Sequence, residues 1–295
     1  MATIELKGAS FDYVERGRGE TLVLVHGSAS DHRTWQGQLG PLSEHFRVIA
    51  YSRRYHFPNQ PIASGNDYSM PEHIADLKAL IDALELSPAH LVGHSYGAFV
   101  CLLLAILAPA RVRSLVLTEP PVLPLVVRIP PQPSDLLKLF LTRPLTGIAV
   151  AKLAGGGLGP AGAEAKRGNK EEALRLMGTA ILGREFFEHL SRERLAQARD
   201  NFIEQELLGS PFPPLTADQV RAVHCPVLLV GGEHSPTVFR RLTSLLHGLL
   251  PCAQRIAIAR ASHLVHEDQP SAYTSAVLRF LSEQPSAGAP GSKPW

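Results

Sequence analysis

The sequence predicts an α/β fold in which a mostly parallel sheet is flanked by helices and carries an inserted helical cap. Two observations support this class. Apolar runs typical of strands buried on both faces of a parallel sheet occur at 21–25, 113–118 and 225–232, with helix-like apolar spacing between them. Residues 122 to about 215 contain proline-rich patches and amphipathic stretches but no such run, so we expect a mainly helical insertion there.

The composition is that of a globular protein with a sizeable core. The 295 residues are 45% hydrophobic and 19% charged, close to the average for such proteins. The formal net charge is +2, from 29 Lys and Arg against 27 Asp and Glu, which gives no reason to expect nucleic acid or a membrane as partner. The 13 histidines show no metal-ligand spacing, so we expect neither a metal nor a cofactor.

Cysteine usage and the N-terminus predict a cytoplasmic setting. Cys101, Cys225 and Cys252 are odd in number and scattered, which is not a disulfide framework. No long apolar segment follows a basic start, and the longest apolar stretch, 98–109, is shorter than the roughly 20 residues of a membrane span. The oligomeric state is left open between monomer and homodimer.

The first part of the chain is predicted to lead up to a sharp turn. In order, we expect a hairpin over 3–6 and 11–15, a strand over 21–25, a short helix over 31–42, a strand over 46–51, a helix from about 70 to 84 and a strand over 90–92. That strand runs into Gly93-His94-Ser95-Tyr96-Gly97, and an apolar helix begins after it. The pattern G-x-S-x-G between strand and helix is typical of a nucleophile elbow, which makes Ser95 the candidate nucleophile.

The second part returns to the sheet after the insertion. We expect a helix over 98–108, strands over 113–118, 225–232 and 254–259, and helices over 236–250 and 270–283. The predicted domains are therefore a core of residues 1–121 and 216–284, a cap of residues 122–215 and a disordered tail of residues 285–295, which is rich in Pro and Gly.

The order of these motifs resembles the α/β-hydrolase fold family over residues 10–283. The matching segments are His26-Gly27-Ser28, the Ser95 elbow and Ala261-Ser262-His263, where many relatives carry Gly-His. The resemblance implies an eight-stranded sheet, with His263 as the general base. It also implies an oxyanion hole formed by the amides of Ser28 and Tyr96. Epoxide hydrolases and haloalkane dehalogenases of this fold use aspartate at the elbow, so Ser95 disfavours both activities.

The acid of the predicted triad departs from the usual family pattern. Most relatives carry an aspartate after the strand that corresponds here to 227–230, where this chain has Gly232-Glu233-His234-Ser235. A subset places its acid after the preceding strand, where this chain has Glu119 followed by two prolines. We therefore favour Glu119, with Glu233 as the alternative and Asp268 as a third choice.

Substrate contacts are predicted from residues near the loops. Trp35, Arg53 and Phe57 are candidates for the pocket, and the pair Arg53-Arg54 could bind a substrate carboxylate. His26 and His94 are expected to orient loops through hydrogen bonds. Aromatic and aliphatic residues of the cap suggest an apolar substrate of medium size: Leu137, Leu139, Phe140, Phe186 and Phe187.

These features predict an enzyme that acts on a small molecule. The favoured function is hydrolysis of an ester or lactone through a Ser-His-Glu triad and an acyl-enzyme. The same triad suits a carbon–carbon hydrolase acting on a diketone-like substrate. A non-catalytic small-molecule receptor and a cofactor-free lyase or oxygenase are further possibilities on this scaffold.

Overall fold

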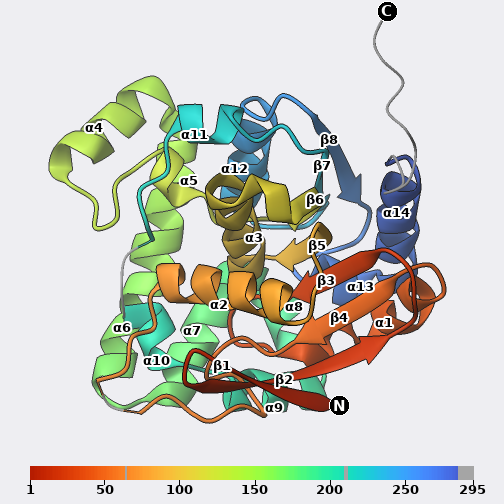
Figure 1. Ribbon diagram of the computed structural model, residues 1–295. Coiled ribbons are helices and arrows are strands. Elements are labelled where there is room, and N and C mark those ends of the chain that lie inside the picture. Colours follow the sequence, from red (N-terminus) through yellow and green to blue (C-terminus); the bar gives the residue numbers. More distant parts are fainter. Residues whose placement is uncertain (64, 209–211, 285–295) are drawn as a thin grey trace, which may run out of the picture.

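The computed structural model describes residues 1–63, 65–208 and 212–284 and confirms the predicted α/β class (Figure 1). One eight-stranded sheet runs through the molecule. Its strands are β1 (Ala2–Leu6), β2 (Ala9–Arg16), β3 (Thr21–Val25), β4 (Arg47–Tyr51), β5 (Ala89–His94), β6 (Val112–Thr118), β7 (Val227–Gly232) and β8 (Ala253–Ile258). The predicted tail, residues 285–295, lies outside the described residues.

The strands follow the order β1-β2-β4-β3-β5-β6-β7-β8. Strands β1, β2 and β4 pair in antiparallel fashion, and all later pairs are parallel. The central strands β3 and β5 are almost entirely buried, and burial on both faces explains why β3 is a nearly continuous apolar run. The carboxyl ends of β5, β6 and β7 therefore meet at one edge of the sheet, the usual place for a site in a parallel α/β fold.

Helices cover both faces of the sheet. One apolar core joins the sheet to α2 (Met70–Ala83), α3 (Tyr96–Leu107) and α12 (Thr237–His247), and a second joins it to α1 (Gln36–Ser43) and α14 (Pro270–Ser282). Helix α3 is buried nearly all round, as its uniformly apolar sequence predicts. Short elements complete the core: η1 (His32–Trp35), η2 (Pro109–Arg111), η3 (Leu123–Leu125), α11 (Ala217–Arg221) and α13 (Val265–Asp268).

The insertion between β6 and β7 is helical over residues 133–208. Its elements are α4 (Pro133–Thr142), α5 (Pro144–Leu153), the π-helical turn η4 (Ala154–Leu158), α6 (Gly159–Lys166), α7 (Lys170–Leu182), α8 (Arg184–Glu188), α9 (Arg192–Asp200) and α10 (Glu204–Leu208). Figure 1 shows α4 projecting from the body, with α6, α7 and α10 gathered beside one another.

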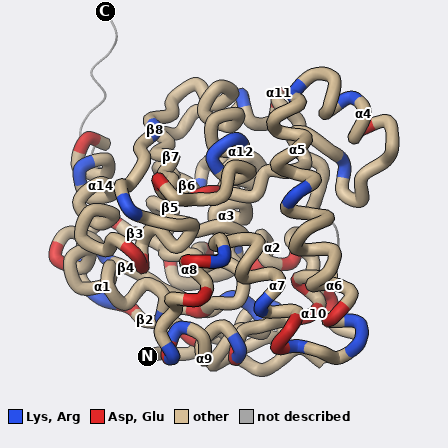
Figure 2. Tube along the Cα trace, turned by 180° about the vertical axis from the view of Figure 1, so that it is seen from behind, with Lys and Arg blue, Asp and Glu red and all other residues tan. Residues whose placement is uncertain are grey.

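Charged residues lie mainly on the outside of the helices. Figure 2 shows both signs along α6 and α9, whereas the charged residues of α10 are glutamates. Some of these exposed side chains form salt bridges, such as Arg175 with Glu172 and Arg199 with Glu171. Across the described ranges, no helix has the length and apolar character that crossing a bilayer would require.

Candidate active site

The turn between β5 and α3 places Ser95 at the carboxyl edge of the sheet. Ser95 has φ 49° and ψ −118°, a left-handed conformation that is strained for a residue with a side chain. Its amide donates to the carbonyl oxygen of Thr118 at 2.8 Å, which ties the turn to β6. The flanking glycines are needed sterically: a Cβ at Gly93 would lie 2.5 Å from Cα of Ala98, and one at Gly97 would lie 2.4 Å from carbonyl oxygens of β3 and the following loop.

Glu119 and His263 meet behind this turn. Nδ1 of His263 lies 2.6 Å from Oε2 of Glu119, and Oε1 of Glu119 accepts a hydrogen bond from the amide of Gly232 at 2.9 Å. Glu119 is fully buried and has φ 49°, so its backbone is strained like that of Ser95. In the tautomer whose Nδ1 donates to this carboxylate, Nε2 of His263 is left as the acceptor.

Two aromatic rings pack against the ring of His263. Phe239 of α12 stacks on it, with ring centroids 4.0 Å apart, and the ring of His94 contacts it in a tilted arrangement with centroids 4.8 Å apart. His94 also donates from Nε2 to the carbonyl oxygen of His263 at 2.9 Å. Burial, helped by the charges of His266 and His263, holds the pKa of His94 well below its usual value, so His94 is a neutral donor.

His263 lines the same small cavity as Ser95, and its second ring nitrogen, Nε2, is not engaged by any part of the chain that the structure describes. This nitrogen is buried and has no hydrogen-bond partner among the described residues. Ser95 and His263 both line a cavity of about 50 Å³, together with Ser28 and His94. Ser95 and His263, whose Nε2 has no partner in the described ranges, thus line one cavity. Proton transfer from a serine hydroxyl to an imidazole requires such an arrangement.

The other two candidate acids are engaged elsewhere. Glu233 is exposed, and its Oε2 accepts from the amide of Arg260 at 2.8 Å. Asp268 accepts from both the amide and the hydroxyl of Ser262, at 2.7 and 2.6 Å. Of the three acids, Glu119 is the one that accepts a hydrogen bond from His263 Nδ1.

The loop after β3 faces the elbow. Ser28 lines the cavity beside Ser95, and its amide has no hydrogen-bond partner among the described residues. Tyr96 is the first residue of α3, where an amide has no carbonyl of a preceding turn to bind. Both predicted oxyanion amides therefore lie next to Ser95 with their hydrogen-bonding capacity open.

Helix α9 of the insertion fastens this loop. Arg194 donates to the carbonyl oxygen of Ala29 at 3.2 Å. The buried carboxylate of Asp31 accepts from the side-chain amides of Gln197 and Asn201 at 3.0 and 2.7 Å. The insertion thus fixes the backbone on which the Ser28 amide depends.

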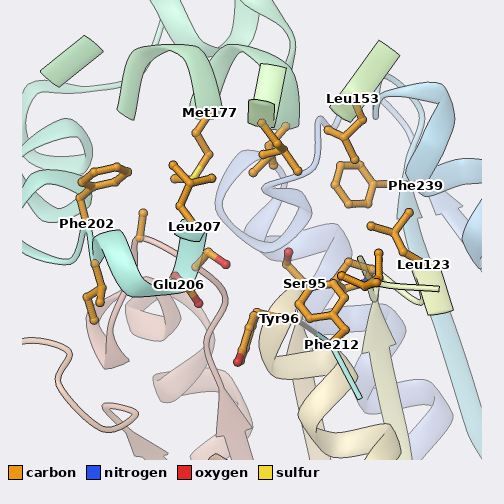
Figure 3. A pocket seen from close by; sticks show the side chains of 17 residues that line it. Ser95, Tyr96, Leu123, Leu153, Met177, Phe202, Glu206, Leu207, Phe212 and Phe239 are labelled. Atoms are coloured by element: carbon orange, nitrogen blue, oxygen red, sulfur yellow. The ribbon is translucent and has the colours of Figure 1, made fainter. Parts of the chain in front are cut away.

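A larger cavity of about 250 Å³ opens over Ser95, between the sheet edge and the insertion (Figure 3). Its walls are almost wholly apolar, and among the described residues that line it Glu206 is the one with a charged side chain. The lining residues are Ser28, Ala29, Ser95, Tyr96, Pro121, Leu123, Ile129, Leu153, Leu158, Met177, Ile181, Phe202, Ile203, Glu206, Leu207, Phe212 and Phe239.

The three residues expected to line the pocket lie outside this cavity. Trp35 is fully buried in the core on the α14 side, where its ring packs against His266. Phe57 is 43% exposed, with the guanidinium of Arg33 over its ring. Arg53 is buried behind the wall, with its guanidinium over the ring of Tyr96 at 4.5 Å. These residues were chosen for their residue type and their nearness to loops, and neither property shows on which side of the backbone a side chain lies.

The residues of the insertion that were expected to form an apolar wall also differ from those observed. Leu137 and Phe140 are 63% and 41% exposed, and Phe187 lines only the smaller cavity. Other residues take their place, among them Met177 and Phe239. Met177 lies on α7 of the insertion and Phe239 on α12 of the core, and apolar spacing along a helix does not separate residues that face a pocket from residues that face the core.

The paired arginines are likewise not available to a substrate. Nε of Arg54 donates to Oδ2 of the buried Asp76 at 2.7 Å, and Arg53 binds Glu206 and backbone carbonyls. Nδ1 of His26 bonds the carbonyl oxygen of Gly27 at 2.8 Å, and its Nε2 accepts from the amide of Arg53. Within the described ranges, no group of three or more His, Cys, Asp or Glu side chains is arranged to hold a metal ion.

Comparison with known proteins agrees with this architecture. A family model described as "alpha/beta hydrolase fold" matches residues 20–270. The 2-hydroxy-6-oxo-2,4-heptadienoate hydrolase of Pseudomonas putida is 40% identical over 105 residues, which is 34% of this chain and 37% of that relative, so the match spans little more than a third of the relative's length.

Two solved structures superpose over nearly the whole chain. They are a thermophilic esterase of Thermogutta terrifontis (TM-score 0.73, 20% identity, 95% of this chain and 96% of that one) and the enol-lactonase of Burkholderia xenovorans LB400 (0.73, 19%, 96% and 100%). At these identities they speak for the fold alone. With the family model matched over most of its length, the chain belongs to the α/β hydrolase fold family.

Proposed function

We propose that the protein is a serine hydrolase that cleaves an ester or lactone of a small, apolar substrate. Ser95 is the nucleophile, His263 the general base and Glu119 the acid that orients it. The single observation that carries the proposal is the hydrogen bond from His263 Nδ1 to Glu119, which leaves Nε2 free in the cavity shared with Ser95.

The geometry supports a two-step acyl transfer. His263 Nε2 takes the hydroxyl proton of Ser95 as the oxygen attacks the substrate carbonyl, and the amides of Ser28 and Tyr96 stabilise the oxyanion. The protonated His263 then gives its proton to the leaving alkoxide. Water, deprotonated by the same nitrogen, attacks the acyl-enzyme and releases the acid. Glu119 stays ionised and stabilises the imidazolium at each step.

The apolar walls of the larger cavity support the choice of substrate. Its volume of about 250 Å³ and its leucine, methionine and phenylalanine lining suit a short acyl or ring substituent. The esterase and the enol-lactonase that share the fold are consistent with this class, although they resemble the chain only in architecture.

The test compares the wild type with Ser95→Ala on a panel of esters, lactones and vinylogous diketones. We expect the wild type to hydrolyse esters or lactones and to be labelled at Ser95 by a fluorophosphonate. Ser95→Ala should lower kcat by at least about 10⁴-fold, since removing a triad nucleophile costs that much or more. A folded wild type that neither reacts with the probe nor turns over any member would contradict the proposal and favour a receptor.

A second reaction is supported by one comparison. The Pseudomonas putida relative is named as a hydrolase of a 2-hydroxy-6-oxo dienoate, a carbon–carbon bond substrate, and it matches a third of this chain at 40% identity. Turnover of the diketone members with no turnover of esters or lactones would select this alternative.

A further inference from the structure

Glu206 brings a charge into an otherwise apolar cavity. It lies on α10, and Figure 3 shows it between Leu207 and Tyr96, facing the space above Ser95. Its side chain is 9% exposed, and Oε1 accepts a hydrogen bond from Nη2 of Arg53 at 3.0 Å. Oε2 accepts no hydrogen bond from any described residue. A carboxylate that is nine-tenths buried with one open oxygen is costly unless a further donor completes it.

Arg53 is committed to the protein and does not itself face a substrate. Its Nε donates to the carbonyl oxygen of His26 at 3.2 Å, Nη1 to the hydroxyl of Tyr68 at 3.2 Å, and Nη2 to the carbonyl oxygen of Gly27 at 3.0 Å. Its side chain is fully buried, and it is not among the residues that line the cavity. The carboxylate therefore stands between the guanidinium and the cavity.

Glu206 is the anion that compensates this buried cation. Burial raises the pKa of Tyr68, and burial likewise lowers the pKa values of His26, His56 and His73, so all four neighbours are neutral. Two other buried acids, Asp31 and Asp76, pair with other arginines. The Arg53–Glu206 pair thus joins the loop after β4 to the insertion and presents one carboxylate oxygen to the cavity.

We propose that Glu206 forms a polar subsite that selects substrates bearing a hydrogen-bond donor and rejects substrates bearing a carboxylate. A hydroxyl, amide N–H or ammonium group on the apolar part of the substrate completes the open Oε2. A carboxylate in the same place meets a like charge in a poorly solvated space, where the repulsion is large. This inference rests on the proposed ester or lactone hydrolysis and adds the chemical class of the substrate.

The experiment measures kcat/KM for three p-nitrophenyl esters with acyl chains of equal length: hexanoate, 6-hydroxyhexanoate and the half-ester of adipic acid. The same three tails on the alcohol side of acetate esters cover the opposite orientation of the substrate. The proteins are the wild type, Glu206→Gln and, as a matched control on the same helix, Glu204→Gln. Glu204 does not line the cavity and pairs with Lys170 on the surface.

For at least one orientation, we expect the wild type to prefer the hydroxyl ester and to turn over the carboxylate ester about tenfold to a hundredfold less well than the neutral parent. Glu206→Gln should shrink this penalty at least tenfold, because the like charge is gone and Arg53 lacks its anion. Glu204→Gln should leave all ratios unchanged. If Glu206→Gln does not fold, the preference of the wild type alone decides the matter.

Equal turnover of neutral and carboxylate tails by the wild type in both orientations would overturn the subsite. So would a Glu206→Gln variant that changes all three esters by one common factor. Failure of the proposed function looks different: no ester of either series would be hydrolysed in a Ser95-dependent way.

Discussion

The sheet edge and the helical insertion that covers it hold their side chains in different ways. At the edge, Ser95 and Glu119 have strained backbones, and Glu119 and His263 are 0% and 1% exposed and joined by a hydrogen bond. In the insertion, α4 buries only Leu139, while its neighbour Leu137 is 63% exposed.

This difference suggests that the sheet edge carries the catalytic reaction and that the insertion selects the substrate. The edge is over-determined by ladder hydrogen bonds and close backbone contacts, so it can store strain and hold reacting groups in place. The wall that the insertion gives to the larger cavity is built mainly of apolar side chains, and such packing tolerates replacement of one side chain by another of similar size. Changes at the edge should therefore alter rate, and changes in the insertion should alter which substrate is used.

The largest effect is expected at Glu119. Glu119→Gln removes the charge that stabilises the imidazolium of His263, and we expect kcat to fall by about 10³- to 10⁴-fold. Glu233→Gln and Asp268→Asn serve as controls and should stay within about threefold of the wild type, because neither carboxylate binds His263. A larger loss of kcat in Glu233→Gln than in Glu119→Gln would make Glu233 the triad acid and weaken the contrast between the sheet edge and the insertion.

The next largest effect is a loss of stability at acid pH, which we expect to arise from histidines buried beneath the carboxyl edge of the sheet. Burial holds the pKa of His266 at about 3 and those of His26, His56, His73 and His94 well below 6.5. The unfolded chain binds protons at these groups below about pH 6.5 while the folded chain does not, so stability is complete above that pH and is lost as the pH falls. At pH 5, the lowered pKa of His266 alone reduces the free energy of unfolding by about 2 kcal/mol relative to its value above pH 6.5.

Thermal unfolding followed by circular dichroism from pH 8 to 4 tests this. The Tm should be flat above pH 7 and fall steeply below pH 6. His266→Gln should reduce the slope, whereas His189→Gln, which changes the exposed histidine of the insertion, should leave it unchanged. A Tm that does not depend on pH between 7 and 4.5 would be incompatible with a neutral histidine cluster.

The same contrast explains what could be predicted from the sequence. The elbow is readable because Gly93 and Gly97 are forced by backbone contacts at fixed spacing. Strands such as β3 are readable because burial on both faces demands a continuous apolar run. Glu119 was identified because the position after β7 has no carboxylate in the usual place.

The pocket could not be predicted in the same way. Its walls come from helices whose orientation depends on tertiary packing, so an apolar residue such as Leu137 or Met177 looks alike whether it faces solvent or cavity. Helix ends add to this difficulty, because Gly183, which has φ 90°, separates α7 from α8 within the insertion. Glu206 gave no signal, because its partner Arg53 is 153 residues away in sequence.

The smallest effect is expected from the wall of the insertion. Met177 lines both cavities and is 9% exposed, so Met177→Ala enlarges the space over Ser95. We expect kcat/KM for octanoate esters to rise relative to acetate esters by about tenfold, the lower end of the roughly 10- to 200-fold that one methylene in an apolar pocket is worth. Leu137 is exposed on α4 of the same insertion, so Leu137→Ala is the matched control and should leave the acyl-chain profile unchanged.

If both variants shift the profile equally, the insertion acts through its overall stability and not through the wall it gives to the cavity. If Met177→Ala instead lowers all esters by one factor, selection by chain length belongs to the sheet edge, and the division between the two regions fails.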